Sequence, residues 1–159
     1  MIAVISAVLP AGCGFSVKIT ENRGSLQRFC LMCTDFESLE SLALSCSLLN
    51  DEDGKKLRRL KILRQSYIDD GAGFTDITFT EGICHLSMEE LPMDSCNRTT
   101  GLGISCTNMS RGRLWELSSS NCDGIEDSDL EIVLRRGIRT LRSLHVSSCK
   151  SVLRIHALT

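Results

Sequence analysis

The chain has 159 residues, of which 42% are apolar and 24% are charged, and its formal net charge is −2. This length suits one domain that is large enough to bury a core. The near-neutral charge argues against the strongly basic surface of a dedicated nucleic-acid-binding domain, so we expect no nucleic-acid partner.

The first nine residues are apolar, but they contain no lysine or arginine and are too short to span a bilayer. We therefore interpret them as a capping strand or the edge of a truncated repeat, and we expect no association with a membrane. Residues 1–25 show no recognisable repeat. We predict an irregular N-terminal segment or a partial capping repeat there, followed by one continuous array over residues 26–159.

The first half of this array carries irregular copies of a short pattern in which leucine or a similar residue recurs at the first, fourth and sixth places; we call each copy a rung. Residues 39–47 form one rung, with cysteine at the eighth place, and residues 57–62 form another that reads L-x-x-L-x-I. Residues 26–31 lie too close to residue 39 for both to be full repeats. These irregular intervals indicate a deletion and an insertion relative to the second half.

Three regular rungs follow, at residues 88–96, 114–122 and 141–149, and they start 26 and 27 residues apart. All fit L-x-x-L-x-L-x-x-C, loosely at Ser119. The period and the closing residue are those of leucine-rich repeats. We predict an α/β fold: a short leucine-rich-repeat solenoid with a curved parallel β-sheet on its concave face and helices or irregular turns on its convex face. The clear repeats extend from about 88 to 155.

Residues 128–136 are predicted to form a helix that returns along the convex side. Ser128 and Glu131 form a capping-box pattern, and Gly137 is suited to end the helix. Residues 49–54 and 68–71 resemble weaker versions of the same strand-to-helix turn. Three apolar residues at helical spacing are expected to face the sheet: Leu130, Val133 and Leu134.

The nine cysteines form an odd set, which argues against complete internal pairing in disulfides. We interpret Cys96, Cys122 and Cys149 as structural repeat cysteines that point inward as free thiols. Buried thiols favour a reducing compartment, so we expect a cytoplasmic or nuclear location. Two glycosylation sequons, at Asn97 and Asn108, favour a secreted chain instead, and a glycan on either residue would reverse this expectation.

The rung pattern, its period and the sequence I-x-D-x-x-L after Cys122 resemble the cysteine-containing class of leucine-rich repeats. This class is best known from F-box/leucine-rich-repeat proteins, the substrate receptors of ubiquitin ligases. The resemblance covers residues 36–155 and is strongest over 88–149, and no F-box is recognisable before it. It implies a protein–protein interaction module, with substrate recognition in ubiquitin ligation as the closest functional analogy and ubiquitin-ligase subunits among its partners.

We expect a protein partner on the concave face, where such arrays usually bind. The alternation of side chains along a strand predicts which residues lie there. Trp115, the only tryptophan, is the proposed anchor because tryptophan is frequent at interface hot spots; in the competing interpretation it folds over its own rung. The predicted partner-binding residues are Arg58, Arg59, Lys61, Glu89, Glu90, Asp94, Trp115, Glu116, Asn121, Arg142 and His145.

Cys30 and Cys33 have the C-x-x-C spacing of half a structural zinc site. A complete site needs four ligands, and the sequence contains no second C-x-x-C pair. We therefore predict no metal ligands and no cofactor, and a zinc-binding module that uses Cys30 and Cys33 stays as an alternative.

The sequence contains no G-x-S-x-G, P-loop or H-E-x-x-H motif, so we predict no catalytic residues and no enzyme activity. Another alternative is a leucine-rich-repeat fragment of an immune receptor or pathogen effector. Extracellular arrays more often close their rungs with asparagine, so the closing cysteines favour the intracellular interpretation.

Overall fold

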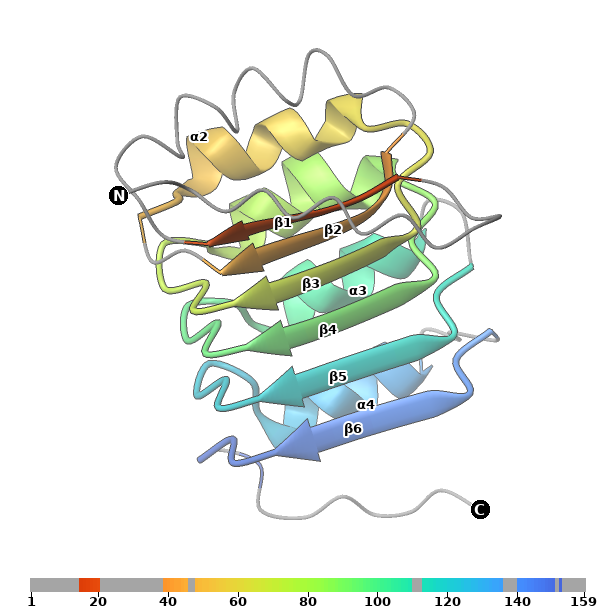
Figure 1. Cartoon of the computed structure of the whole chain (residues 1–159). Helices are drawn as coiled ribbons and strands as arrows, with labels where there is room; N and C mark the ends of the chain where they lie inside the picture. The colour runs from red at the N-terminus through yellow and green to blue at the C-terminus, as the bar shows by residue number, and fades with distance from the viewer. Residues whose placement is uncertain are drawn as a thin grey trace.

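The computed structural model describes residues 15–20, 39–45, 48–109, 113–135, 140–150 and 152. They form a six-stranded parallel sheet in which each strand pairs with the next one along the chain, and helical segments cover one face of this sheet (Figure 1). The predicted α/β class with a parallel sheet is confirmed. No helix in the described part of the chain is both long and apolar enough to cross a membrane.

The strands are β1 (Phe15–Thr20), β2 (Leu39–Ser45), β3 (Gln65–Asp69), β4 (Glu90–Asp94), β5 (Glu116–Ser120) and β6 (Ser143–Ser147). The helical segments between them are α2 (Asp51–Gly54), α3 (Gly101–Met109) and α4 (Asp127–Arg135), together with the 3-10 helices η1 (Lys55–Arg59) and η3 (Ile83–His85) and the π-helical turn η2 (Thr78–Gly82).

The strands predicted from four rungs are confirmed. Residues 39–47 supply β2, and the three regular rungs supply β4, β5 and β6. Leucines at equivalent places stand in register, since Leu91 pairs with Leu117 and Leu117 with Leu144. Their inward side chains form the core of the sheet, with Leu91 and Leu117 buried and Leu144 partly buried.

The rung predicted at residues 57–62 is wrong. Leu57 lies in η1, and the next strand is β3, whose rung begins at Leu63 and places Ser66 and Ile68 inward. The rung pattern matched residues 57–62 falsely because leucines at i and i+3 suit a helix as well as a rung. It missed β3 because Ser66 occupies the fourth place, where the other rungs have leucine.

With β3 in its observed place, the spacing between successive rungs changes regularly. The third place of each rung pairs with the third place of the next, from Ser41 to Gln65, Glu90, Glu116 and Ser143. These steps are 24, 25, 26 and 27 residues, so every return path is one residue longer than the one before it. The predicted deletion and insertion are therefore wrong.

Residues 1–25 contain a strand that the rung pattern did not predict. β1 pairs in parallel with β2, from Ser16 opposite Ser41 to Thr20 opposite Ser45, with an irregularity at Phe15. Its sequence alternates apolar and polar residues but lacks the leucine spacing of a rung. The rung considered at residues 26–31 lies outside the described residues.

The helix predicted at residues 128–136 is confirmed as α4, which begins one residue earlier. Leu130 and Val133 are buried against the sheet, whereas Leu134 is only half-buried. Gly137 lies outside the described residues. The strand-to-helix turn expected at residues 49–54 is also confirmed, because it contains α2.

Different residues from those predicted cap α4. The helix begins before Ser128, so the carboxylate of Asp129 accepts the N–H of Glu126 at 3.1 Å and replaces the expected Ser128–Glu131 pair. At α2, the Asn50 side chain accepts the N–H of Glu52 at 2.9 Å, in the manner of a regular N-cap.

Candidate functional site

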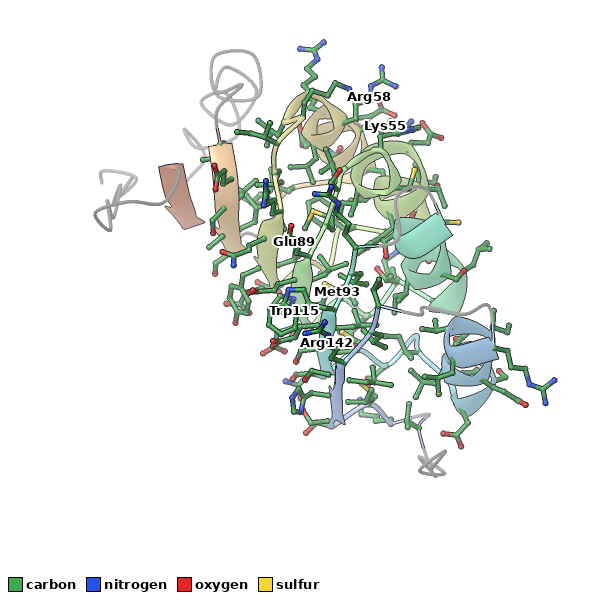
Figure 2. All side chains as sticks on the ribbon, turned by 90° about the vertical axis from the view of Figure 1, so that its right-hand side faces the viewer. Lys55, Arg58, Glu89, Met93, Trp115 and Arg142 are labelled. Atoms are coloured by element: carbon green, nitrogen blue, oxygen red, sulfur yellow. The ribbon has the colours of Figure 1, made fainter. Side chains whose placement is uncertain are left out.

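The sheet face opposite the helices holds the side chains at the third, fifth and seventh places of each rung, and we call it the open face. Its alternation with the buried first, fourth and sixth places follows the pleat of the strands. Figure 2 shows the sheet edge-on, with the helical segments on one side. The open face of β2 to β6 consists of Ser41, Ala43, Ser45, Gln65, Tyr67, Asp69, Glu90, Pro92, Asp94, Glu116, Ser118, Ser120, Ser143, His145 and Ser147.

Four predicted binding residues lie on the open face: Glu90, Asp94, Glu116 and His145. His145 is exposed on β6, the last described strand, and its Nε2 lies 2.9 Å from the Ser143 hydroxyl. The two glutamates are direct neighbours in the sheet, since Glu90 pairs with Glu116 in the register of β4 and β5.

The second places of the rungs form a column beside the open face, which we call the second-place column: Glu40, Arg64, Glu89, Trp115 and Arg142. Backbone hydrogen bonds hold it together. The N–H of Trp115 donates to the carbonyl of Glu89 at 2.9 Å, and the N–H of Arg142 donates to the carbonyl of Trp115 at 2.8 Å. Three more predicted binding residues are therefore brought together here, as Figure 2 also shows.

Trp115 is half-buried in this column. Its place just before β5 sets it between Glu89 and Arg142, two charged neighbours at the same place of adjacent rungs. Arg64 and Glu89 form an ion pair, with Nη1 of the arginine 3.3 Å from Oε1 of the glutamate. Trp115 is thus partly exposed, with a charged residue at the same place of each adjacent rung.

Two pairs of carboxylates flank the centre of the open face. The first is Glu90 and Glu116, and Gln65 donates its side-chain N–H to Glu90 at 2.9 Å. The second is Asp69 and Asp94. Ile68 pairs with Met93 in the sheet, and each aspartate directly follows one of these two residues. Like charges on adjacent strands repel each other, so neither pair stabilises the fold.

Tyr67 lies between these two pairs on β3, and its side chain is 41% exposed. Partial burial, followed by the negative charges of Asp69 and Asp94, raises the pKa of the Tyr67 phenol. The centre of the open face is therefore an exposed aromatic ring in a negative electrostatic environment.

Asn121 follows β5 in the turn that ends the rung. It has a positive φ of 53°, and equivalent residues of the other rungs have the same left-handed conformation: Asp70, Ser95 and Ser148. The side-chain N–H of Asn121 donates to Asp94 Oδ1 at 2.9 Å. Asn121 thus fixes the orientation of a carboxylate at the edge of the open face.

The prediction that Arg58, Arg59 and Lys61 line the sheet is wrong. Arg58 and Arg59 lie in η1, and Lys61 lies in the turn after it, so these residues belong to the helical side of the molecule. Figure 2 shows Arg58 there, beside Lys55 and away from Trp115. The physical reason is the misplaced rung, which treated a helical leucine spacing as a strand.

Three residues of β3 take their place on the open face: Gln65, Tyr67 and Asp69. The rung pattern missed them because Ser66 stands where a leucine was expected. A signal was nevertheless present, since Asp70 and Gly71 form a turn pattern of the kind that follows a strand. The expected basic end of the binding surface is therefore replaced by polar, aromatic and acidic side chains.

The closing cysteines point into the core, as predicted. Cys96, Cys122 and Cys149 are all buried and free, and the thiol of Cys122 donates to the carbonyl of Ser120 at 3.2 Å. A hydrogen bond with the neighbouring Cys122 thiol, together with burial, raises the pKa of Cys96, and burial raises the pKa of Cys149. The same hydrogen bond between the two thiols lowers the pKa of Cys122 to about 6. Cys96 and Cys149, whose pKa values are raised, are protonated structural groups rather than nucleophiles.

Among the described residues, no group of three or more histidine, cysteine or acidic side chains is placed to hold a metal ion. Cys30 and Cys33, the pair considered for zinc, lie outside the described residues. Of the two sequon asparagines, Asn97 is exposed, and its side-chain oxygen accepts the N–H of Asp123 at 3.1 Å.

No protein-family model matches this chain, and the comparison with curated proteins finds no match.

Proposed function

We propose that this chain is a non-catalytic protein-binding module that holds its partner on the open face and the adjacent second-place column. The observation that carries the proposal is that five adjacent strands present their outward side chains in register, with Tyr67 and Trp115 accessible among polar and charged groups. Accessible aromatic residues with a polar surround are typical of interface anchors.

The fold that we propose is a leucine-rich-repeat solenoid with a curved sheet, in which the open face is the concave one. Three features support it: the rung spacing of 24 to 27 residues, the inward closing cysteines and the left-handed residue that ends four successive rungs. Such a solenoid offers an extended binding surface. The resemblance to F-box/leucine-rich-repeat proteins makes substrate recognition for ubiquitin ligation the closest analogy, and the free thiols favour the cytoplasm or nucleus.

An affinity purification of the tagged chain from its own cells tests this function. We would compare the wild type with the Tyr67→Ala, Trp115→Ala double variant and with Ile132→Ala, which removes an exposed apolar side chain from the helical side. We expect one dominant protein that is lost in the double variant and retained in the control. Recovery of ubiquitin-ligase subunits would support the ligase analogy. Identical protein sets from all three samples would contradict binding at the open face.

A further inference from the structure

The open face and the second-place column have an unbalanced charge. Together they contain six carboxylates and two guanidinium groups, whereas the whole chain has a net charge of only −2. The carboxylates are Glu40, Asp69, Glu89, Glu90, Asp94 and Glu116, and the guanidinium groups are Arg64 and Arg142. Since Arg64 pairs with Glu89, the two like-charge pairs near Tyr67 keep their negative charge.

The hydrogen bonds at these carboxylates orient them without neutralising them. Glu90 accepts from the neutral side chain of Gln65, Asp69 accepts from the Ser45 hydroxyl at 3.1 Å, and Asp94 accepts from Asn121. Each of these three carboxylates is therefore held in place by a neutral group that supplies no compensating positive charge. A cationic group from a partner would relieve the repulsion within each pair, so binding is strongest for a partner of opposite charge.

The two carboxylate pairs define the spacing between the cationic side chains of such a partner. Glu90 and Asp94 are four residues apart on β4, which corresponds to about 13 Å along a strand. Tyr67 and Pro92 occupy the fifth places between them. An extended peptide that runs along the strands would place alternate side chains over these three levels: a cationic one, an apolar one and a second cationic one.

From this geometry we propose that the open face binds an extended, basic segment of another protein, with lysine or arginine at i and i+4 and an apolar residue at i+2. The inference rests on the proposed function, because it names the chemistry of the partner for the same surface. The cations lie over the Glu90–Glu116 and Asp69–Asp94 pairs, and the apolar residue contacts Tyr67. A cation beside this ring also gains from the attraction between cations and aromatic faces.

The test begins with a random dodecapeptide display library that is selected on the immobilised full chain. The strongest peptide is then labelled and titrated by fluorescence anisotropy, at two salt concentrations, against three variants. Glu90→Gln with Glu116→Gln removes one charge pair without changing side-chain shape. Glu126→Gln with Glu131→Gln makes the same charge change at exposed residues of the helical side. Tyr67→Ala reports whether a peptide binds at the open face at all.

We expect selected peptides to carry the basic, apolar, basic spacing. The Glu90, Glu116 variant should bind about tenfold more weakly, with a smaller salt dependence, while the matched control stays within about twofold. Its melting temperature should rise slightly, because a like-charge pair is removed; weaker binding by a more stable protein excludes misfolding as the cause.

The remaining outcomes separate the two proposals. Peptides without basic residues that lose binding in Tyr67→Ala would overturn the basic-partner inference and leave the proposed function in place. Selected peptides whose affinity is unchanged in both open-face variants, or a selection that enriches no peptide, would contradict both.

Discussion

The carboxylate of Asp51, at the start of α2, caps Thr75, which begins the helical segment of the next repeat. It accepts the Thr75 N–H at 2.8 Å and the Thr75 hydroxyl at 2.7 Å. Asp76 accepts the same two groups of Thr100, each at 2.8 Å. The start of a helix leaves several N–H groups without partners inside the helix. Here two successive repeats each supply the acceptor for the repeat that follows.

Replacing Asp51 with alanine should reduce the free energy of unfolding by about 1–2 kcal/mol, the usual cost of losing a helix cap. Thr78 loses an acceptor as well, because its N–H and hydroxyl both donate to Asp51. Urea denaturation measures this loss. Glu52→Ala, which removes only a surface ion pair with Lys55, is the control and should cost much less. Equal losses in the two variants would show that the cap has no special role.

The same carboxylate should make stability depend on pH. Burial alone would raise the pKa of Asp51, but hydrogen bonds from Thr75 and Thr78 outweigh it and lower the pKa below its ordinary value. A lowered folded-state pKa gives stability that is present above the unfolded pKa, about 3.9, and is lost as the pH falls through the folded value. The stability difference between wild type and Asp51→Asn should therefore be larger at pH 7 than at pH 3. A difference that is constant with pH would contradict this linkage.

The next repeat has no such aspartate cap, because Gly101 stands at the place that Asp51 and Asp76 occupy in the two preceding helical segments. A Cβ atom at Gly101 would lie 2.2 Å from the Cβ of Asp129 and 2.7 Å from its Cα. Gly101→Ala should therefore destabilise the protein by about 1–3 kcal/mol, as overpacking does. Thermal unfolding checks this, with Leu102→Ala at a 56% exposed position of the same helix as the control. A Gly101→Ala variant as stable as wild type would show that α3 and α4 can move apart without cost.

Two buried serines should respond in opposite directions to the same substitution. The Ser66 hydroxyl is fully buried without a hydrogen-bond partner, whereas the Ser105 hydroxyl donates to the Leu102 carbonyl at 2.9 Å. Ser66→Ala should leave stability unchanged or raise it by up to about 1 kcal/mol, because an unpaired polar group is removed. Ser105→Ala should cost about 1 kcal/mol. Equilibrium unfolding of both variants measures the contrast, and a loss of stability in Ser66→Ala would point to a partner for its hydroxyl.

The regular strands could be predicted because their inward first, fourth, sixth and ninth places hold leucine, methionine, valine or cysteine, with Ser119 the one exception, and because the pattern returns three times in register. β3 escaped prediction because Ser66 weakens its pattern, while Leu57 and Leu60 in and after η1 imitate it. The acidic side chains that β4 and β5 place on the open face were predicted, but Tyr67 at its centre was not, because β3 was misplaced.

The caps between repeats could not be predicted from sequence. Asp51 and Thr75 are 24 residues apart, and nothing in either local sequence indicates that they meet. Their contact depends on the register of two successive strands and on the length of the path between them. Gly101 is similar, because its lack of a side chain has meaning only beside Asp129. Such relationships follow from the stacking of repeats rather than from the pattern within one.

Because each return path is one residue longer than the one before it, the repeats are similar but not interchangeable. A repeat moved to another place in the series would bring a connection one or more residues too short or too long, and its caps and closing cysteine would lose their partners. Duplication or deletion of a single repeat would create the same mismatch at one junction. The order of the repeats is thus encoded by the lengths of their connections as well as by their contacts, which restricts how this chain can be lengthened, shortened or recombined.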